Sequence, residues 1–518
     1  MEDKQSWYSS RWVPVFAGMM VELCGGSIYI PSLYTSDLKS RFFGGPAGQS
    51  SIETLVFACN LGNWFPAAGF FQDSRFGGGT STTLIACALT FVGYMGLWAW
   101  SAEFITPPFW LVWVFWFIWG HGSGWFDNAA VTMVAKNFPK QRGRAMGLIK
   151  AFYGLGGSVL TTAYNLFFFE ETTSFLLFLA IFLSALGVMS SFFIFDVPDE
   201  VRNEHDGHQR RFVFGLLDVI CLACFLMAMN VASVAFGTSF GIKAAAFLGS
   251  MVFMLSLLVL VYGSRTASEH AFDTRDLTGG ENATLRDVTL GQAFRMLDTY
   301  LMFCIMFVGM GVGLVVLNNA GQMVGSLEGS QETNTILVSL MSVANCFGRI
   351  AYGVVPDVLS HRLSRPFFIA VNMVLLISGQ LLLACASIET LFIGGMVAGF
   401  SYGGFWTLAP SMVADLFGTK NFASLYTSFT IAVSSGSLIF STLLCARLYD
   451  LEAQSHPAKT QSDCLGPTCF RLTNFICAGA GVVGLAVAVL LHVRVKLRSR
   501  EMVAAASMRG TSLQPPRG

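Results

Sequence analysis

Apolar stretches of about 20 residues alternate with short polar segments along almost the whole chain. A helix needs about 20 apolar residues to cross the hydrocarbon core of a bilayer, so each such stretch is a candidate span. Fourteen stretches qualify, and they predict transmembrane helices at 12–34, 52–71, 81–100, 109–135, 145–168, 174–195, 213–237, 242–262, 299–321, 334–354, 366–387, 391–413, 421–446 and 472–494. The pattern predicts an all-α polytopic membrane protein.

Composition and charge agree with that class. Hydrophobic residues make up 54% of the chain and charged residues 12%, against about 25% charged in soluble domains. If the chain starts inside, 23 of the 31 Lys and Arg residues fall in segments on the inner side and six on the outer side. Positive charge in short loops sets orientation, so both termini are predicted to be cytoplasmic. A net charge of zero gives no reason to expect a nucleic-acid partner. We expect a monomer in the plasma membrane.

Two internal matches indicate that the chain contains related halves. Residues 16–23 match 307–314, and residues 120–158 align without gaps with 399–437, including a shared Gly-x-x-x-Gly spacing. Two parallel six-helix repeats are typical of rocking transporters, whose substrate site lies between the halves near the midplane. The predicted organisation is an N-terminal bundle at 1–205, an extra helix pair with a cytoplasmic linker at 206–298, a C-terminal bundle at 299–497 and a disordered cytoplasmic tail at 498–518.

Each half carries an aspartate in the loop after its second helix. The first loop reads Gly-Phe-Phe-Gln-Asp73-Ser-Arg75, and the second reads Gly-Val-Val-Pro-Asp357 with Arg362 five residues later. Such charges can form cytoplasmic contacts that break and reform as the bundles rock, and we expect Arg349 to serve the Asp357 loop. The pattern resembles the loop signature of the major facilitator superfamily, although in the first copy glycines replace the usual terminal basic residue.

A narrower resemblance covers almost the whole chain. The segments that carry it include Arg-Trp-Val-Pro-Val-Phe-Ala at 11–17, Asn-Phe-Pro-Lys-Gln-Arg-Gly at 137–143 and Gly-Leu-Val-Val-Leu-Asn-Asn-Ala-Gly at 313–321. They are similar to the nodulin-like branch of that superfamily. The resemblance implies transport by alternating access without identifying a substrate. Some protozoan members are associated with iron export, and the wider neighbourhood includes proton-coupled monocarboxylate carriers.

Glu22 is the principal candidate for ion or substrate binding. It falls at the middle of the first predicted span, where a carboxylate usually faces a cavity or a partner. Helical spacing places small residues, among them Gly18 and Gly25, on or near its face. Because hard cations prefer oxygen ligands, Glu22 is also a possible metal ligand. The alternative is a protonated glutamic acid that packs against a neighbouring helix.

Five further polar residues fall inside predicted spans. Lys150 could bind an anion or pair with a carboxylate, but its place near a helix end favours snorkelling to the cytoplasmic surface. His121 could relay protons or bind metal, although a packing role is favoured, and Asp127 turns to another face of the same helix. Asn318 and Asn319 suit either substrate hydrogen bonds or bonds between helices.

Two loop features complete the candidates. His205 and His208, flanked by acids in a cytoplasmic loop, form a weak candidate metal cluster, for which a solvated linker is the favoured interpretation. Cys464 and Cys469 lie five residues apart in the last outward loop, around a Gly-Pro turn. An oxidising exterior favours a disulfide between them.

These features predict a secondary transporter of a small solute that works by alternating access, with iron export as the first candidate. The runner-up is a proton-coupled carrier of a monocarboxylate or another organic anion, which requires Lys150 or another cation at the site. A different class, a membrane sensor built on a transporter fold, remains open. The sequence contains no phosphate-binding glycine loop and no nucleophile motif, so neither an enzyme nor a bound cofactor is predicted. The expected partners are the solute and the bilayer.

Overall fold

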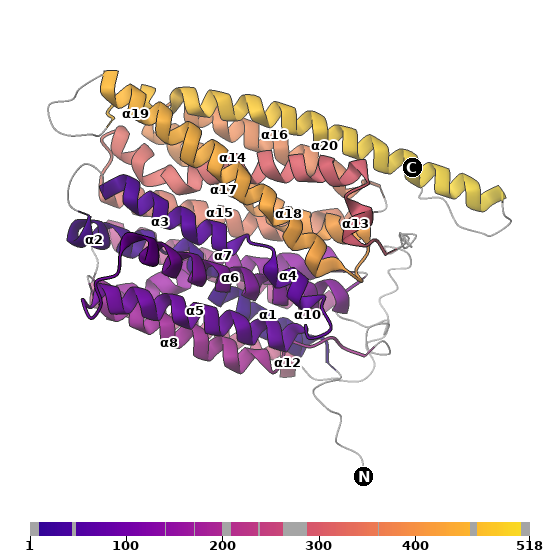
Figure 1. The fold of residues 1–518 in the computed structure, drawn as a ribbon, viewed down its shortest axis with the longest axis horizontal. Coiled ribbons are helices and arrows are strands. Elements are labelled where there is room, and N and C mark those ends of the chain that lie inside the picture. Colours follow the sequence, from indigo (N-terminus) through magenta and orange to yellow (C-terminus); the bar gives the residue numbers. More distant parts are fainter. Residues whose placement is uncertain are drawn as a thin grey trace, which may run out of the picture.

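The computed structural model describes residues 10–43, 48–139, 141–169, 171–198, 209–236, 239–262, 287–360, 362–455 and 464–508. Within these ranges the chain is helical and forms two bundles side by side, with the first-half helices on one side and the second-half helices on the other (Figure 1). Within the described residues, 11 helices are long and apolar enough to cross a membrane. The predicted class of all-α membrane protein is confirmed.

The first bundle contains nine helical segments. They are α1 (Trp12–Gly25), the 3-10 helix η2 (Gly26–Tyr29), α2 (Ser32–Phe42), α3 (Gly48–Asn63), α4 (Ala67–Gln72), α5 (Gly79–Ser101), α6 (Phe109–Asn137), α7 (Arg142–Phe167) and α8 (Thr172–Ser191). The second predicted span is broken, because α3 and α4 are separated at Trp64–Pro66 and Pro66 has no N–H group to continue the helix.

The second bundle has the same order of helices and a longer last one. Its segments are α13 (Leu290–Ala293), α14 (Leu297–Ser326), α15 (Gln331–Val358), α16 (Arg365–Ala384), α17 (Ile388–Phe417), α18 (Phe422–Gly436), the π-helix η3 (Ser437–Cys445), α19 (Ala446–Ser455) and α20 (Thr468–Met508). Helix α20 extends past the end of the bundle (Figure 1). Because it continues to Met508, the prediction of a disordered tail from residue 498 is wrong over that stretch.

Matched glycines in the two bundles allow the same close approach between helices. A Cβ atom at Gly120 would lie 2.2 Å from the carbonyl oxygen of Cys59, and one at Gly124 would lie 2.1 Å from that of Asn63. Cβ atoms at the aligned Gly399 and Gly403 would lie 2.6 and 2.0 Å from carbonyl oxygens of α15. Any larger residue would therefore push α6 away from α3 and α17 away from α15. The repeat seen in the sequence corresponds to a repeated helix contact.

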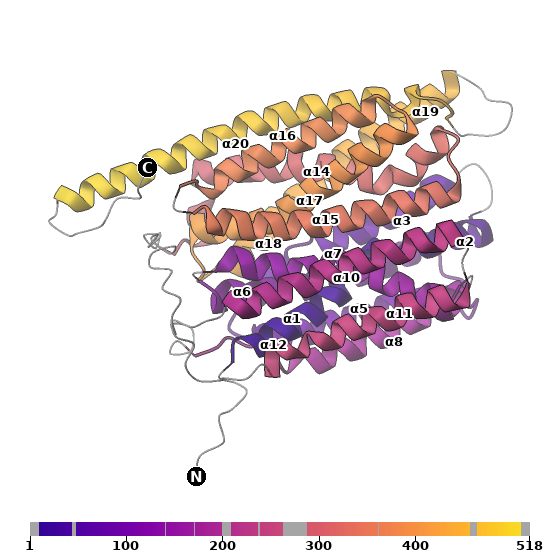
Figure 2. The same cartoon turned by 180° about the vertical axis from the view of Figure 1, so that it is seen from behind.

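The extra segments α10 (Gln209–Phe236), α11 (Phe240–Ser256) and α12 (Leu258–Tyr262) lie outside the two bundles. Helix α10 packs against both α7 of the first bundle and α15 of the second, and α11 packs against α7. Figure 2 shows this pair beside α15 and in front of the first bundle. The bundles therefore meet along two seams, one at α7–α15 that the pair covers and one at α4–α18.

Candidate functional site

Four buried charged side chains of the two bundles lie close together. They are Glu22 on α1, Asp127 on α6, Lys150 on α7 and Arg349 on α15, with exposed fractions of 0%, 8%, 1% and 0%. Charged groups at this depth are costly and usually mark a transport pathway. The expectation that Lys150 snorkels to the surface is wrong, because α7 begins at Arg142 and carries Lys150 more than two turns into the protein.

Lys150 and Asp127 form an ion pair that a residue of the other bundle completes. The Lys150 ammonium donates to Asp127 Oδ1 and to the Tyr426 hydroxyl, the latter at 3.2 Å. The Tyr426 hydroxyl in turn donates to Asp127 Oδ2 at 3.1 Å. Because Tyr426 lies on α18, the triangle joins the two bundles. Both charges are therefore compensated in this closed arrangement.

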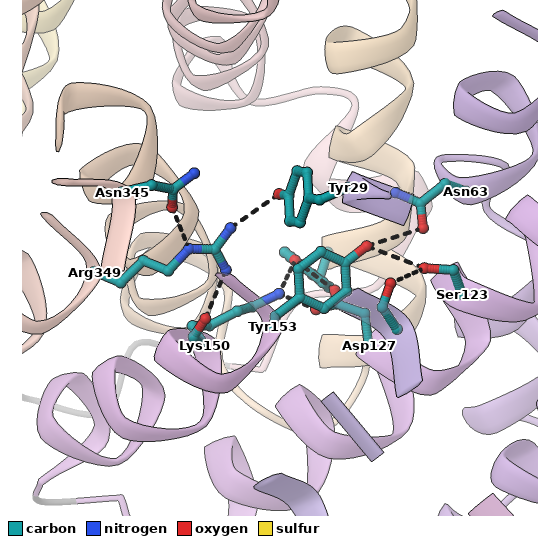
Figure 3. Close-up of polar contacts among 10 residues, drawn as sticks. Tyr29, Asn63, Ser123, Asp127, Lys150, Tyr153, Asn345 and Arg349 are labelled. Atoms are coloured by element: carbon teal, nitrogen blue, oxygen red, sulfur yellow. Dashed lines mark hydrogen bonds and ion pairs between the residues drawn. The ribbon is translucent and has the colours of Figure 1, made fainter. Parts of the chain in front are cut away.

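Arg349 is surrounded by neutral acceptors (Figure 3). Its Nε donates to Asn345 Oδ1 at 2.7 Å, one terminal nitrogen to the Lys150 carbonyl at 2.8 Å, and the other to the Tyr29 hydroxyl at 3.1 Å. Among the described residues, no carboxylate lies within 4.0 Å of its guanidinium nitrogens. Arg349 therefore carries a buried charge without an ion pair. We expected Arg349 to serve the Asp357 loop. It belongs instead to this central site.

Glu22 lies against another acid, Asp127, and forms no ion pair with a cation among the described residues. Both of its carboxylate oxygens are buried without a hydrogen bond within the described residues, and the charges that act on it most strongly are Asp127, Lys150 and Arg349. Lys150 and Arg349 are the cations that act on Glu22. Among the described residues, the site contains one ion pair, one acid that lies against the paired aspartate, and one base without a carboxylate within 4.0 Å.

A small pocket opens beside the ion pair where the two bundles meet. Its walls combine aromatic and polar residues, and the residues that line it are Asn63, Trp64, Phe65, Gly124, Asp127, Lys150, Tyr153, Trp406, Tyr426, Thr427 and Thr430. The Lys150 ammonium lies 5.4, 5.2 and 5.6 Å from the ring centres of Tyr153, Trp406 and Tyr426, within the range of cation–π attraction. The space of about 10 Å³ holds roughly one water molecule. A larger solute requires the bundles to separate.

Side chains from neighbouring helices hydrogen-bond the backbone at the break between α3 and α4. His121 Nδ1 lies 2.9 Å from the Gly62 carbonyl, and its other ring nitrogen accepts from the Trp125 indole at 2.9 Å. Across the seam, Thr430 donates to the Trp64 carbonyl at 3.1 Å and Thr427 to the Pro66 carbonyl at 3.2 Å. Both nitrogens of His121 are thus engaged, which supports its packing role.

The two loop aspartates each contact a helix start in the opposite bundle. Asp73 accepts from the backbone N–H and the hydroxyl of Ser424, both at 2.7 Å, in the first turn of α18. Asp357 accepts from the backbone N–H of Arg144, at 3.0 Å, in the first turn of α7. A negative charge at a helix N-terminus is favourable because it meets free N–H groups. The two contacts close the predicted cytoplasmic end.

The basic residues proposed for these loops are not the ones that pair. Arg365, which we did not single out, lies 2.7 Å from Asp357 Oδ1 and also pairs with Asp415. Arg142 of the first bundle contacts the same Asp415 at 3.2 Å. Arg75 and Arg362 are exposed and form no ion pair within the part of the chain that the structure describes.

The remaining candidates lie away from the central site. Asn318 and Asn319 donate to the Ser441 hydroxyl of the π-helix η3 at 3.3 and 3.2 Å, so they join two helices of one bundle. Cys464 and Cys469 form a disulfide with an S–S distance of 2.00 Å. His205 and His208 lie outside the described residues. Within those residues, no group of three or more His, Cys, Asp or Glu side chains could hold a metal ion.

Sequence reasoning missed the aromatic residues that complete the site. Tyr426 faces Asp127, but the internal alignment places it opposite Gly147, so the repeat gave no hint of its role. Trp406 lies among many other aromatic residues in a chain that contains 14% Phe, Trp and Tyr. Only their position in space distinguishes them.

Two family models together match most of the chain. The model described as "Nodulin-like" matches residues 11–262, and that described as "NFD4, C-terminal domain" matches residues 281–499. Protein NUCLEAR FUSION DEFECTIVE 4 of Arabidopsis thaliana is 24% identical over 94% of this chain and 89% of its own length. Probable transporter MCH1 of Yarrowia lipolytica is 26% identical over 45% of this chain and 50% of its own.

Solved structures share the fold at low identity. The proton:xylose symporter XylE of the major facilitator superfamily aligns with a TM-score of 0.54 and 14% identity, over 92% of this chain and 94% of its own. The human organic anion transporter MFSD10 aligns with the same TM-score and 13% identity, over 93% and 99%. These likenesses concern the arrangement of the helices.

Proposed function

Because the chain belongs to the nodulin-like family of the major facilitator superfamily and is a secondary transporter, we propose that it moves a small organic carboxylate together with a proton. The observation that carries this proposal is Arg349, a fully buried guanidinium whose hydrogen-bond acceptors are all neutral. Arginine matches the geometry of a carboxylate with two parallel N–H donors. A carboxylate substrate would supply the ion pair that the described residues do not.

The charge count of the site supports coupling to one proton. With Glu22 and Asp127 ionised, the two acids balance Lys150 and Arg349. A carboxylate without a hydrogen-bond partner is costly to bury, and a proton on Glu22 removes that cost. The site then carries one net positive charge, and binding of one monovalent anion makes its net charge zero. In this scheme Glu22 carries the proton, Arg349 binds the carboxylate, and the Lys150–Asp127 pair lines the pocket.

Iron export stays a prediction that rests on resemblance. A cation in this site would lie beside two buried positive charges, Lys150 and Arg349, and electrostatic repulsion would oppose its binding. Glu22 and Asp127 are two acids, one of them already paired with Lys150. The geometry therefore favours the organic anion over the metal ion. A sensor role stays a prediction as well.

Uptake into proteoliposomes tests the proposal. We expect the purified protein to accumulate small carboxylates when the outside is acidified, without nucleotide. Arg349→Gln should reduce this uptake tenfold to a hundredfold, because it removes a charge-assisted contact. Arg295→Gln, which changes an exposed arginine, is the matched control. Uptake of iron but of no carboxylate by the unmodified protein would contradict the proposal.

The role of Glu22 is tested separately. Glu22→Gln keeps the size of the side chain and removes the proton-binding group. We expect accumulation driven by a pH gradient to disappear, while exchange of labelled for unlabelled carboxylate across the membrane continues. Normal accumulation across pH would show that Glu22 is a packing residue, and the proton coupling would then need another group.

A further inference from the structure

Two indole N–H groups in the wall of the central pocket have no acceptor. Trp64, at the break between α3 and α4, and Trp406, on α17, both line the pocket and are 4% and 5% exposed. The indole nitrogen of each is buried without a hydrogen bond. A buried donor without a partner costs free energy, and most buried polar groups in proteins are paired. These two donors therefore require an explanation.

The other polar side chains that line the pocket are already paired. Lys150, Asp127 and Tyr426 bond to one another, and Tyr153 donates to Asn63 Oδ1 at 3.3 Å. Thr427 and Thr430 donate to backbone carbonyls. The hydroxyl of Tyr402 lies near the Trp406 indole but outside hydrogen-bond geometry. Among the described lining residues, the fully buried polar atoms without a partner are these two indole nitrogens, one in each bundle.

We infer that the Trp64 and Trp406 indole N–H groups determine specificity, by donating to a second oxygen function of the transported anion. This inference rests on the proposed function. The charge count admits one negative charge, which the substrate carboxylate supplies beside the cations Lys150, which lines the pocket, and Arg349, which the bundles would expose when they separate. The indoles then require neutral acceptors, so the favoured substrate is a small monocarboxylate with an oxygen on the adjacent carbon, as in a 2-oxo or 2-hydroxy acid. An aliphatic monocarboxylate of the same length would leave both donors unpaired.

The placement of the donors links recognition to closure. Trp64 belongs to the first bundle and Trp406 to the second, and the pocket between them holds only about one water molecule in this arrangement. A substrate with acceptors for both indoles would bridge the bundles when they close around it. A substrate without them would leave two buried donors unpaired in the closed state. Discrimination is therefore expected in the transport rate as well as in binding.

A pair of three-carbon anions provides the test. Uptake of labelled 2-oxopropanoate and propanoate is measured in proteoliposomes, with protein-free liposomes as the blank, and selectivity is the ratio of their kcat/KM values. The unmodified protein should prefer 2-oxopropanoate. Trp64→Phe and Trp406→Phe each keep an aromatic ring and remove the donor. Each should lower the ratio about tenfold.

Trp119→Phe is the matched control, because its indole nitrogen is also buried without a partner but Trp119 does not line the pocket. It should leave the ratio unchanged. Equal transport of the two anions by the unmodified protein, or an equal loss of both in the pocket variants, would overturn the inference and leave the proposed function standing. Transport of neither anion, with no effect of Arg349→Gln on any carboxylate, would overturn both.

Discussion

The loops at Asp73 and Asp357 occupy equivalent places in the two bundles and form equivalent contacts of different strength. Each aspartate accepts hydrogen bonds from the first turn of a helix in the opposite bundle. Among the described residues, Asp73 accepts hydrogen bonds there from Ser424 alone, from a backbone N–H and a hydroxyl. Asp357 in addition pairs with Arg365, which pairs with Asp415, which contacts Arg142 of the first bundle. The Asp73 contact is therefore a helix cap alone, whereas the Asp357 contact is a helix cap that is part of a network of ion pairs.

This difference shows how a duplicated motif acquires unequal roles. Separation of the bundles at the predicted cytoplasmic end must break both caps, but on the Asp357 side it must also pull Arg142 away from Asp415. The free energy of opening is therefore expected to come mainly from the second loop. Spin labels can be attached at Phe76→Cys and Lys420→Cys, two exposed positions on opposite bundles, in a background without other reactive cysteines. Their separation reports opening.

The largest effect is expected for Asp357→Asn. The Asp357–Arg365 pair, with side-chain exposures of 7% and 15%, lies within the second bundle and persists on opening. The change therefore acts through the charge that caps α7 across the bundles, and a partly buried charge at a helix terminus contributes up to about 2 kcal/mol. We expect roughly a thirtyfold shift toward the open cytoplasmic end, seen as growth of the long-distance population. Asp37→Asn, which removes an exposed carboxylate from Arg41, is the control. An unchanged distance distribution would show that the network does not hold the bundles together.

A smaller shift is expected for Asp73→Asn. The amide oxygen still accepts from Ser424, so the change removes only the charge at the start of α18, an effect of about 0.5–1 kcal/mol. The same distance measurement should show a severalfold shift at low ionic strength and less at high salt, because the interaction is screened. If Asp73→Asn opened the protein as much as Asp357→Asn, the two loops would be equivalent and our comparison would be wrong.

Ser424→Ala isolates the hydroxyl contribution to the Asp73 cap. The backbone N–H of residue 424 still donates to Asp73, so only one of two hydrogen bonds is lost, at about 0.5–1 kcal/mol. Combined with Asp73→Asn, it should have less effect than the sum of the single changes, because both act on one contact. A double-mutant cycle on the distance populations measures this coupling, and strict additivity would argue against a shared contact.

Arg75→Gln and Arg362→Gln should have the smallest effect. Both residues are exposed and form no ion pair within the described chain, and surface changes of this type usually stay within about 0.5 kcal/mol. Transport rates and distance populations should match those of the unmodified protein. A shift toward the open state as large as that expected for Asp357→Asn would restore these residues to the gate that their position in the sequence suggested.

The repeated architecture was predictable because it depends on patterns that the sequence displays directly. Runs of apolar residues give the spans, and glycines at matching intervals give the close contacts of α6 with α3 and of α17 with α15. The break between α3 and α4 was less visible, since Pro66 alone does not show where a helix resumes. Most of helix α2 lies beyond the first predicted span, which ends at residue 34, because its sequence is too polar to extend that span.

The candidate site was only half predictable, because burial is a property of the assembled bundles. Glu22 falls at the middle of a span, and its depth follows from helix length alone. Lys150 and Arg349 fall nearer to span ends, and the choice between snorkelling and burial depends on how deeply α7 and α15 are covered by each other and by α10. Arg365 was missed for a similar reason, because the start of α16 decides whether that residue faces Asp357.

The helix pair α10–α11 exposes the two seams between the bundles to different surroundings. Lipid chains cannot reach the α7–α15 seam without displacing α10, whereas at the other seam Phe70 of α4 is 47% exposed and Ile431 of α18 is 40% exposed. Bilayer thickness should therefore act on the transport cycle asymmetrically, since mismatch with helix length costs fractions of a kcal/mol per Å. A thicker or thinner bilayer would act directly on the α4–α18 seam. It would act on the α7–α15 seam only through the helix pair α10–α11. The acyl-chain length of the surrounding lipids should therefore affect the transport rate of this protein.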